Sequence, residues 1–198
     1  MDVPVIVELT RCDSGAKEQA RIETLAREAA KSQIDGSWWN DLPATLRAPA
    51  DEPDRHWEWR VIVSKFQNKP YYRAKCVISN DNLIQAAMLF RVDALSALAT
   101  GQRAVFVDRL ATAPRNRDKL VTAPVFRGGG TGLLVYAVAQ SYSLGFKGRV
   151  NLFPVANVHF YTGLGFQPTN VTQGDDALFE LPAASAIALL KTKGLIDD

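Results

Sequence analysis

The hydrophobic pattern in the first quarter of the chain predicts a strand, a helix and a turn-rich connection. The apolar run Val3 to Leu9 is short and suits a β-strand. Asp13-Ser14-Gly15 supplies cap and turn chemistry, so we expect a helix over 16–33 with an apolar stripe of Ile22, Leu25, Ala26 and Ala29. Residues 34–46 should form a loop into a second short helix, and the proline-bearing residues 47–54 a surface linker.

The middle of the chain predicts one helix followed by three strands. Asp54 can cap a helix that carries Trp57 and Phe66 and ends before Pro70. A strand is the alternative, because apolar side chains also alternate over 59–63, and we prefer the helix. Strands over 71–79 and 83–92 are joined by Asn80-Asp81-Asn82, whose side chains tolerate the left-handed conformations of tight hairpins. A third strand over 104–112 completes an antiparallel meander.

The last third alternates helices and strands. We expect a helix over 131–143 with Gly145 as its C-cap, a strand over 149–153, and a short helix that begins near Pro154. Residues 166–167 and 177–181 should pair as strands around a polar loop, 168–176, before a final helix over 183–193. This order of elements predicts an α/β (α+β) fold.

Length and charge narrow the class. A chain of 198 residues with 47% hydrophobic content suits one compact domain, 1–198. Its net charge of +2 argues against a nucleic-acid or membrane-surface partner. Residues 101–149, however, carry eight basic and two acidic side chains, a net charge of +6 that suits a ligand with several phosphates. Cys12 and Cys76 have no metal-like spacing, so we expect reduced thiols, no metal site and, without a basic leader, a cytoplasmic protein.

Strand 104–112 leads into a glycine-rich loop, Arg127-Gly128-Gly129-Gly130-Thr131-Gly132, which opens the next helix. The first N–H groups of a helix have no intrahelical acceptor, and glycines let anionic oxygens approach them, so the junction predicts a phosphate cradle. A nucleoside-triphosphatase loop would need Lys and Ser or Thr after the last glycine, where Leu133 and Leu134 stand. A dinucleotide fingerprint fits poorly, because its third glycine would fall on Leu133.

Two blocks resemble the GNAT superfamily of acyl-CoA-dependent N-acyltransferases. The first is Leu110 to Pro114 together with the loop, which fits Arg/Gln-x-x-Gly-x-Gly; the second is Phe160-Tyr161-Thr162-Gly163-Leu164-Gly165-Phe166. The resemblance covers about 71–181 and implies a mixed, mostly antiparallel central sheet of six to seven strands flanked by helices. Residues 1–70 would then lie on the acceptor side and 183–193 would be the C-terminal helix. The chain departs from the family in an insertion, 115–126, and in Pro154, which stands where an Asn is usual.

The resemblance also assigns roles to residues. It implies acetyl-CoA as acyl donor, with its pyrophosphate on the amides of the loop and its pantetheine arm along the main chain of the preceding strand. Tyr161 would be the general acid and Asp108 a candidate base, for which an ion pair with an Arg is the alternative. Asn151 or Asn157 could replace the missing Asn. The implied cofactor-binding residues are Leu110, Ala111, Thr112, Arg127, Gly128, Gly129, Gly130, Thr131, Gly132, Asn151 and Asn157.

Further charged residues have weaker assignments. The basic insertion residues Arg115, Arg117 and Lys119 would attract the 3′-phosphate of coenzyme A. Acidic side chains in the acceptor-side part would suit a cationic amine, with a solvated surface as the alternative, and structural duty is expected for both histidines. These residues are Asp35, Asp41, Glu58, His56 and His159.

These observations leave three functions open. The first is an N-acetyltransferase that moves acetyl from acetyl-CoA to a primary amine of a small molecule or protein by direct attack, without an acyl-enzyme. The second is a non-catalytic module that binds acyl-CoA. The third is an acetyltransferase of aminoacyl-tRNA, which would need a continuous basic surface. A homodimer is compatible with each of them.

Overall fold

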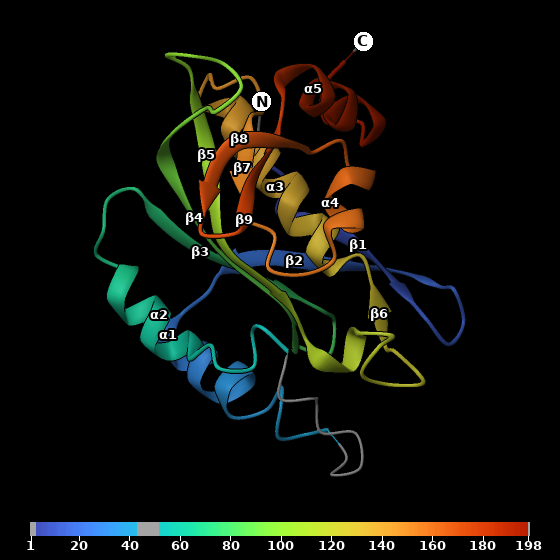
Figure 1. Ribbon diagram of the computed structural model, residues 1–198. Helices are drawn as coiled ribbons and strands as arrows, with labels where there is room; N and C mark the ends of the chain where they lie inside the picture. The colour runs from blue at the N-terminus through green and yellow to red at the C-terminus, as the bar shows by residue number, and fades with distance from the viewer. Residues whose placement is uncertain (1–2, 43–51, 198) are drawn as a thin grey trace. The chain divides into compact units, whose positions relative to one another are not determined.

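The computed structural model describes residues 3–42 and 52–197. Within them, nine strands form a sheet of order β6-β1-β2-β3-β4-β5-β7-β9-β8, mixed but mostly antiparallel (Figure 1). The predicted fold class is confirmed, with more strands than the six to seven expected. The chain divides into two compact units: unit 1 comprises 1–4, 90–108 and 134–198, and unit 2 comprises 5–89 and 109–133. Each unit is described by itself below.

Unit 2 contains the amino-terminal strands and the glycine-rich loop. β1 (Ile6–Arg11) pairs antiparallel with β2 (Lys17–Thr24) and with β6 (Phe126–Arg127), and β2 pairs with β3 (Tyr72–Ile78). The helical part consists of α1 (Arg27–Ala29), the π-helical turn η1 (Ala30–Asp35), and α2 (Trp59–Phe66). A 3-10 turn, η3 (Pro114–Asn116), follows the end of β5.

The predicted helix over 16–33 is wrong, because its first half is strand β2. Gly15 has a φ of +70°, which closes a tight turn between β1 and β2. After the turn the pattern has a period of two: Ala20 and Ile22 are buried, while Lys17, Gln19 and Arg21 are exposed. The helical part begins only at Arg27. Instead of the predicted second helix, residues 36–42 form turns; residues 43–51, with the rest of that helix and most of the predicted linker, lie outside the described residues.

Helix α2 is confirmed, but its start is held by another residue than predicted. The backbone N–H groups of Trp59 and Arg60 donate to the two carboxylate oxygens of Asp35 at 2.8 and 2.9 Å. Asp35 therefore satisfies the first amides of α2 from the end of η1, 24 residues upstream of Trp59. Asp54, the predicted cap, pairs with Arg117 instead. The hairpin of β3 and β4 is confirmed, with Asn82 at a φ of +61°.

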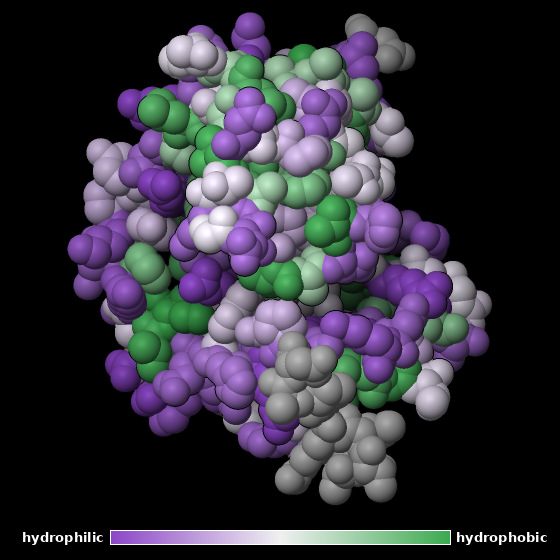
Figure 2. Space-filling model, viewed as in Figure 1, coloured by the Kyte–Doolittle hydropathy of each residue, from purple (hydrophilic) through white to green (hydrophobic). Residues whose placement is uncertain are grey.

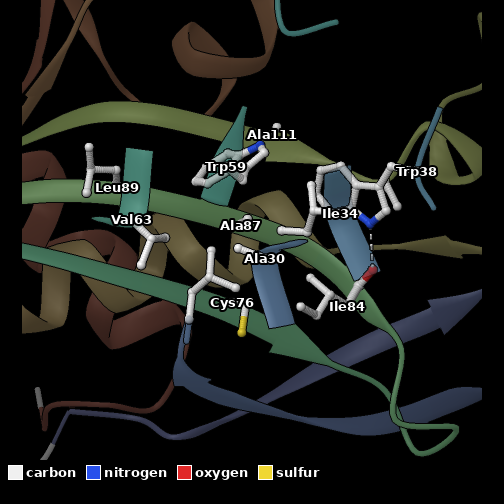
Figure 3. Packing of buried hydrophobic residues seen from close by; sticks show 12 residues of the cluster. Ala30, Ile34, Trp38, Trp59, Val63, Cys76, Ile84, Ala87, Leu89 and Ala111 are labelled. Carbon is white, nitrogen blue, oxygen red and sulfur yellow. Dashed lines mark hydrogen bonds between the residues drawn. The ribbon is translucent and has the colours of Figure 1, made fainter. Parts of the chain in front are cut away.

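The core of unit 2 lies where the helical part meets the sheet (Figure 3). Figure 3 shows Trp59 close to Ala111 of β5, and the indole N–H of Trp38 donating to the carbonyl of Ile84 at 3.2 Å. Because the apolar face of this helical part is used in the core, the outer face of α2 is left with few apolar groups. Val61 of α2 is exposed, and Figure 2 shows green side chains in this region among purple ones.

Unit 1 holds the carboxyl-terminal strands. β4 (Ile84–Leu95) and β5 (Arg103–Thr112) pass from one unit into the other. In unit 1, β5 pairs parallel with β7 (Val150–Leu152), which pairs antiparallel with β9 (Asp176–Leu181), and β9 pairs with β8 (Gln167–Gln173). Helix α3 (Gly129–Ser143) begins in unit 2 and continues in unit 1, which also holds α4 (Val158–Gly163) and α5 (Ala183–Thr192). Gly145, at a φ of +81°, ends α3 as predicted.

The predicted polar loop over 168–176 is mostly strand β8. Gln167, Pro168, Thr172 and Gln173 all lie opposite residues of β9, and Gly174 with a φ of +61° supplies the turn. β8 is the last strand in the sheet order, and most of its side chains are exposed. Because main-chain pairing with β9 holds this strand, its polar sequence gave no hydrophobic pattern from which to predict it. Among the described residues, none of the helices is both long and apolar enough to cross a bilayer.

Candidate functional site

Strand β6 leads through Gly128 into α3, and this junction is the candidate phosphate site of unit 2. The N–H of Gly132 donates to the carbonyl of Gly128 at 2.8 Å, which is the first hydrogen bond of the helix. The N–H groups of Gly129, Gly130 and Thr131 precede that bond and have no acceptor within α3. They therefore point a row of donors and the positive end of the helix dipole at any ligand bound there.

At two of the glycines a side chain would come too close to a neighbouring group. Gly128 has a φ of +102°, and a Cβ at this position would come within 3.0 Å of the carbonyl oxygen of Glu8. A Cβ on Gly132 would come within 3.0 Å of a methyl carbon of Val7, so the first turn of α3 approaches β1 closely. The loop is thus shaped by the absence of side chains, and larger residues would displace it.

The structure brings the loop and the end of β5 against the same short stretch of β4. A Cβ on Gly129 would lie 3.2 Å from the Cβ of Ala86, while the N–H of Ala113 donates to the carbonyl of Gln85 at 2.9 Å. The predicted pantetheine residues 110–112 immediately precede Ala113. Pairing of β5 with β7 is limited to 105–107, so 108–112 extend beyond it.

The insertion 115–126 is hydrogen-bonded to β4 and to β6, the strand that leads into the loop. The Asn116 side chain donates to the Gln85 side-chain oxygen at 3.0 Å and accepts from the backbone N–H of Phe126, also at 3.0 Å. Arg115 donates to the carbonyl of Ile84 and to the same Gln85 oxygen. Sequence reasoning missed Gln85 and Asn116. Gln85, a polar residue inside an apolar strand, was the signal that could have indicated such a network.

Arg117 is the centre of a buried ion cluster. Its guanidinium donates to Glu52 at 3.0 Å and to both carboxylate oxygens of Asp54, and it also makes two hydrogen bonds to the carbonyl of Thr112, at 3.0 and 2.6 Å. Lys119 lies 2.5 Å from Glu52. The expected 3′-phosphate cations are thus engaged with groups of the chain itself. The Thr112 carbonyl is also occupied, by the guanidinium of Arg117.

A pocket of about 540 Å³ lies beside this cluster in unit 2. It gathers two acidic residues expected on the acceptor side, together with His56 and three tryptophans; Asp41 is outside the lining and accepts a hydrogen bond from Ser37. Sequence reasoning did not predict a shared pocket, although the Trp pairs and the acids stood close together in the sequence. The lining residues are Ile34, Asp35, Trp39, Asn40, Arg55, His56, Trp57, Glu58 and Trp59.

In unit 1, Tyr161 lies on α4 with its ring buried between two phenylalanines. The ring centroids of Phe160 and Phe166 are 5.1 and 5.9 Å away, both in edge-to-face geometry. Burial raises the pKa of Tyr161 to about 12. The hydroxyl makes no hydrogen bond to any described residue, and its oxygen, unlike the ring, is not fully enclosed by them. The group is therefore held protonated with its donor unused.

The two asparagines of unit 1 differ in exposure. Asn151 is buried on β7, and its side-chain N–H donates to the carbonyl of Leu95 at 3.0 Å. Its neighbour across the ladder, Glu180, is also buried and accepts from Ser96 at 2.5 Å, so both side chains hold the β4–β5 connection. Asn157 is exposed, with a φ of +52°, at the start of α4. Asp108 is half-buried on β5, just beyond the residues paired with β7.

The chain has the fold of the GNAT acetyltransferases. The AtaT toxin, as a mutant bound to the C-terminus of the antitoxin AtaR, matches with a TM-score of 0.56 and 16% identity over 86% of this chain and 96% of that one. A histone acetyltransferase HPA2-related protein from Corynebacterium glutamicum matches at 0.51 and 16%, covering 82% and 96%. FdhC, a nucleotide-linked sugar GNAT, matches at 0.58 and 8%, covering 96% and 97%. No family model and no curated protein matches the sequence.

Proposed function

We propose that the protein is an N-acetyltransferase that uses acetyl-CoA to acetylate a primary amine. The observation that carries the proposal is the glycine-rich loop, whose amides at the start of α3 have no helical acceptor and in which a Cβ on Gly128, Gly129 or Gly132 would lie 3.0–3.2 Å from a neighbouring atom. The GNAT fold supports it, and so do the solved AtaT structures that contain acetyl-CoA, which cover 86% of this chain at 15 and 17% identity.

The chain's own residues suit the steps that such a transfer needs. The amides of Gly129 to Thr131 would hold the pyrophosphate, and the main chain of Leu110 would pair with the pantetheine arm. Because Arg117 occupies the Thr112 carbonyl, we expect the donor N–H groups of this strand end to act on the ligand. Such N–H groups could polarise the thioester carbonyl as a preorganised donor.

The reaction would be direct attack of the amine nitrogen on the thioester carbonyl carbon. The C–S bond then breaks, and the coenzyme leaves as a thiolate that takes up a proton. Neither cysteine is required. Cys76 is buried beside β2 and burial raises its pKa to about 12, which makes it a poor nucleophile. Asp108 remains the proposed base that takes the proton of the attacking amine.

Tyr161 is the proposed proton donor to the leaving thiolate. Its unpaired hydroxyl supports this role, and a pKa of about 12 keeps the phenol protonated throughout the neutral range. The same pKa makes it a weaker acid than an ordinary thiol, which titrates near about 8.5. Complete proton transfer would therefore be uphill, and we expect a hydrogen bond that stabilises the developing thiolate, with water completing its protonation.

The decisive experiment separates binding from chemistry. Calorimetry with acetyl-CoA measures binding, and release of free thiol in the presence of amine, peptide and charged-tRNA pools measures transfer. Binding with acceptor-dependent thiol release supports the enzyme. Binding without release from any pool would favour the non-catalytic acyl-CoA module, and no binding would reject both.

One relative gives a reason to keep the charged-tRNA pool. AtaT has been solved with acetyl-methionyl-tRNA, and that structure matches with a TM-score of 0.53 and 14% identity, covering 86% of this chain. The likeness is one of fold, so tRNA acetylation is the second candidate. Thiol release that depends on charged tRNA and is lost after its deacylation would select it over small amines.

A further inference from the structure

We infer that the tryptophan-lined pocket of unit 2 is the acceptor site and that it takes a cationic amine carried on a flat apolar group. The inference rests on the proposed function, since an acceptor presupposes acyl transfer. The pocket volume of about 540 Å³ lies within the range of small-molecule sites. Its walls combine Trp39 and Trp57, both half-buried, with the carboxylates of Asp35 and Glu58.

Three contacts tie this pocket to the end of β5, where the thioester is expected. The guanidinium of Arg109, the residue before Leu110, lies 5.0 Å from the ring centroid of Trp57. Arg117 lies 5.2 Å from the ring centroid of Trp39 while its nitrogens bind the carbonyl of Thr112. The pocket floor belongs to the same buried cluster as Ala111, through the residues Ile34 and Trp59 (Figure 3). A ligand in the pocket is thus held beside residues 109–112.

The charges of the pocket leave one carboxylate open to a ligand. Both oxygens of Asp35 already accept N–H groups of α2. Arg55 has an interaction partner of its own. The side-chain carboxylate of Glu58, by contrast, is exposed and makes no hydrogen bond or ion pair with any described residue, and Glu58 stands at the start of α2. An ammonium group in the pocket would therefore find its partner in Glu58.

The aromatic walls call for an apolar group rather than a second cation. Each of the two half-buried rings already carries an arginine over one face, so the cation–π interaction of that ring is in use. The ring surface that remains is apolar and flat. It can stack on an aromatic or similarly flat part of the acceptor. The combination selects a molecule with a flat body and a protonated amine.

The tryptophans make this inference easy to test by fluorescence. All four tryptophans of the chain, at 38, 39, 57 and 59, lie in the pocket lining or its core cluster. Titration of the full chain with 2-phenylethylamine should change their emission. The matched probes are 2-phenylethanol, which lacks the charge, ethylamine, which lacks the ring, and 3-phenylpropionate, which reverses the charge. We expect 2-phenylethylamine to bind at least about tenfold more tightly than each of the three.

Variants assign the recognition to residues, with calorimetry as the readout. Glu58→Gln should weaken binding of 2-phenylethylamine about tenfold and leave 2-phenylethanol unchanged. Trp57→Leu should weaken both. Glu28→Gln, an exposed acid on α1 outside the pocket, is the matched control and should change neither. Equal binding of the amine and the alcohol to the natural chain, or an unchanged amine affinity in Glu58→Gln, would overturn the inference.

These outcomes are distinct from failure of the proposed function. The probe titrations contain no acetyl-CoA, so they report on the pocket even if no transfer occurs. If acetyl-CoA binds and other amines release thiol while 2-phenylethylamine neither binds nor reacts, the proposed function stands and this acceptor class is wrong. If 2-phenylethylamine binds in the predicted order but acetyl-CoA does not bind, the pocket inference loses its role in transfer and is overturned as an acceptor site.

Discussion

Tyr161 combines a buried ring with a hydroxyl that makes no hydrogen bond to any of the residues that the structure describes. Edge-to-face packing with Phe160 and Phe166 holds the ring, so its orientation does not depend on the hydroxyl. The oxygen can therefore be removed without loss of packing. This separates a chemical role from a structural one, which the resemblance alone leaves open.

Replacing Tyr161 by Phe should reduce turnover by roughly a hundredfold while leaving acetyl-CoA affinity nearly unchanged, because a hydrogen bond to the developing thiolate forms only in the chemical step and loss of one such donor typically has an effect of this size. Steady-state kinetics with an active amine provides the measurement. Tyr71→Phe removes an exposed hydroxyl and is the control. Near-normal turnover in Tyr161→Phe would show that Tyr161 has a role in packing only.

The same buried phenol and the Cys76 thiol should make stability fall in alkali. Burial raises both pKa values to about 12, from ordinary values of 10.0 for a tyrosine and 9.0 for a cysteine. The folded state therefore holds these protons more tightly than the unfolded state does. Their contribution is complete below about pH 9 and is lost as the pH rises toward 12, by about 2–4 kcal/mol for each group. Urea unfolding at pH 8, 9.5 and 11 measures the loss.

A variant identifies the source of that loss. Cys76→Ala removes one of the two titrating groups, so its stability should depend less steeply on pH between 9 and 11 than that of the natural chain. Cys12→Ala removes a thiol that is only half-buried and serves as the control. An identical slope in Cys76→Ala would show that the thiol does not titrate differently on folding.

At the scale of elements, the glycine-rich loop is defined by contacts that a side chain would break. Gly128→Val should abolish measurable acetyl-CoA binding, because φ of +102° disfavours a branched residue and its Cβ would meet the Glu8 carbonyl at 3.0 Å. Calorimetry tests this, after circular dichroism has established that the variant is folded. Gly163→Ala is the control, because its Cβ would enter open space. If folded Gly128→Val retains its affinity, the loop is not the binding site of acetyl-CoA.

The ion cluster around Arg117 also connects separate elements, because it joins residues 52–54 and the segment after η3 to the end of β5. Arg117→Met should destabilise the fold by about 3–5 kcal/mol, because Glu52 and Asp54 would remain buried without their main partner. Adding Glu52→Gln and Asp54→Asn removes those charges and should restore most of the loss. Denaturant unfolding of the two proteins measures the difference. Equal stability of both variants would mean that packing of the Arg117 side chain, rather than charge, is what matters.

Local sequence signals were sufficient for elements whose ends are marked by a turn-forming or helix-ending residue. Asn82 and Gly145 adopt the left-handed conformations expected of them, and β3, β4, α3 and α5 follow the hydrophobic pattern. The prediction failed where partners decide the structure. Residues 17–24 pair with β1 and β3, and β8 is held by main-chain bonds to β9 that a polar sequence does not reveal.

The site was predictable to the same extent. The loop and the strand before it have a local pattern of glycines and apolar residues, whereas Gln85 and Asn116 act through contacts with residues 30 or more positions away or across the insertion. The pocket depends on two tryptophan pairs and on Asp35, whose carboxylate is used 24 residues further along. No spacing rule connects such residues before the chain is folded.

At the scale of the whole molecule, the two compact units are not independent segments of sequence. β4, β5 and α3 each begin in one unit and end in the other, so neither unit can lose these elements without affecting the other. Shared strands and a shared helix are expected to make unfolding a single cooperative event. A ligand bound to one unit should therefore stabilise the entire chain.

Acetyl-CoA should consequently raise the thermal midpoint of the whole protein in one transition. Ligand at about a hundred times its Kd adds about 2.7 kcal/mol, which corresponds to a rise of roughly 5–10 °C for a chain of this length. Differential scanning calorimetry measures the midpoint and the number of transitions. Gly128→Val should lose the rise, while Tyr161→Phe should keep it, because the hydroxyl acts in chemistry and not in binding. A rise confined to one of two separate transitions would show that the units unfold independently, and no rise in the natural chain would contradict binding of acetyl-CoA.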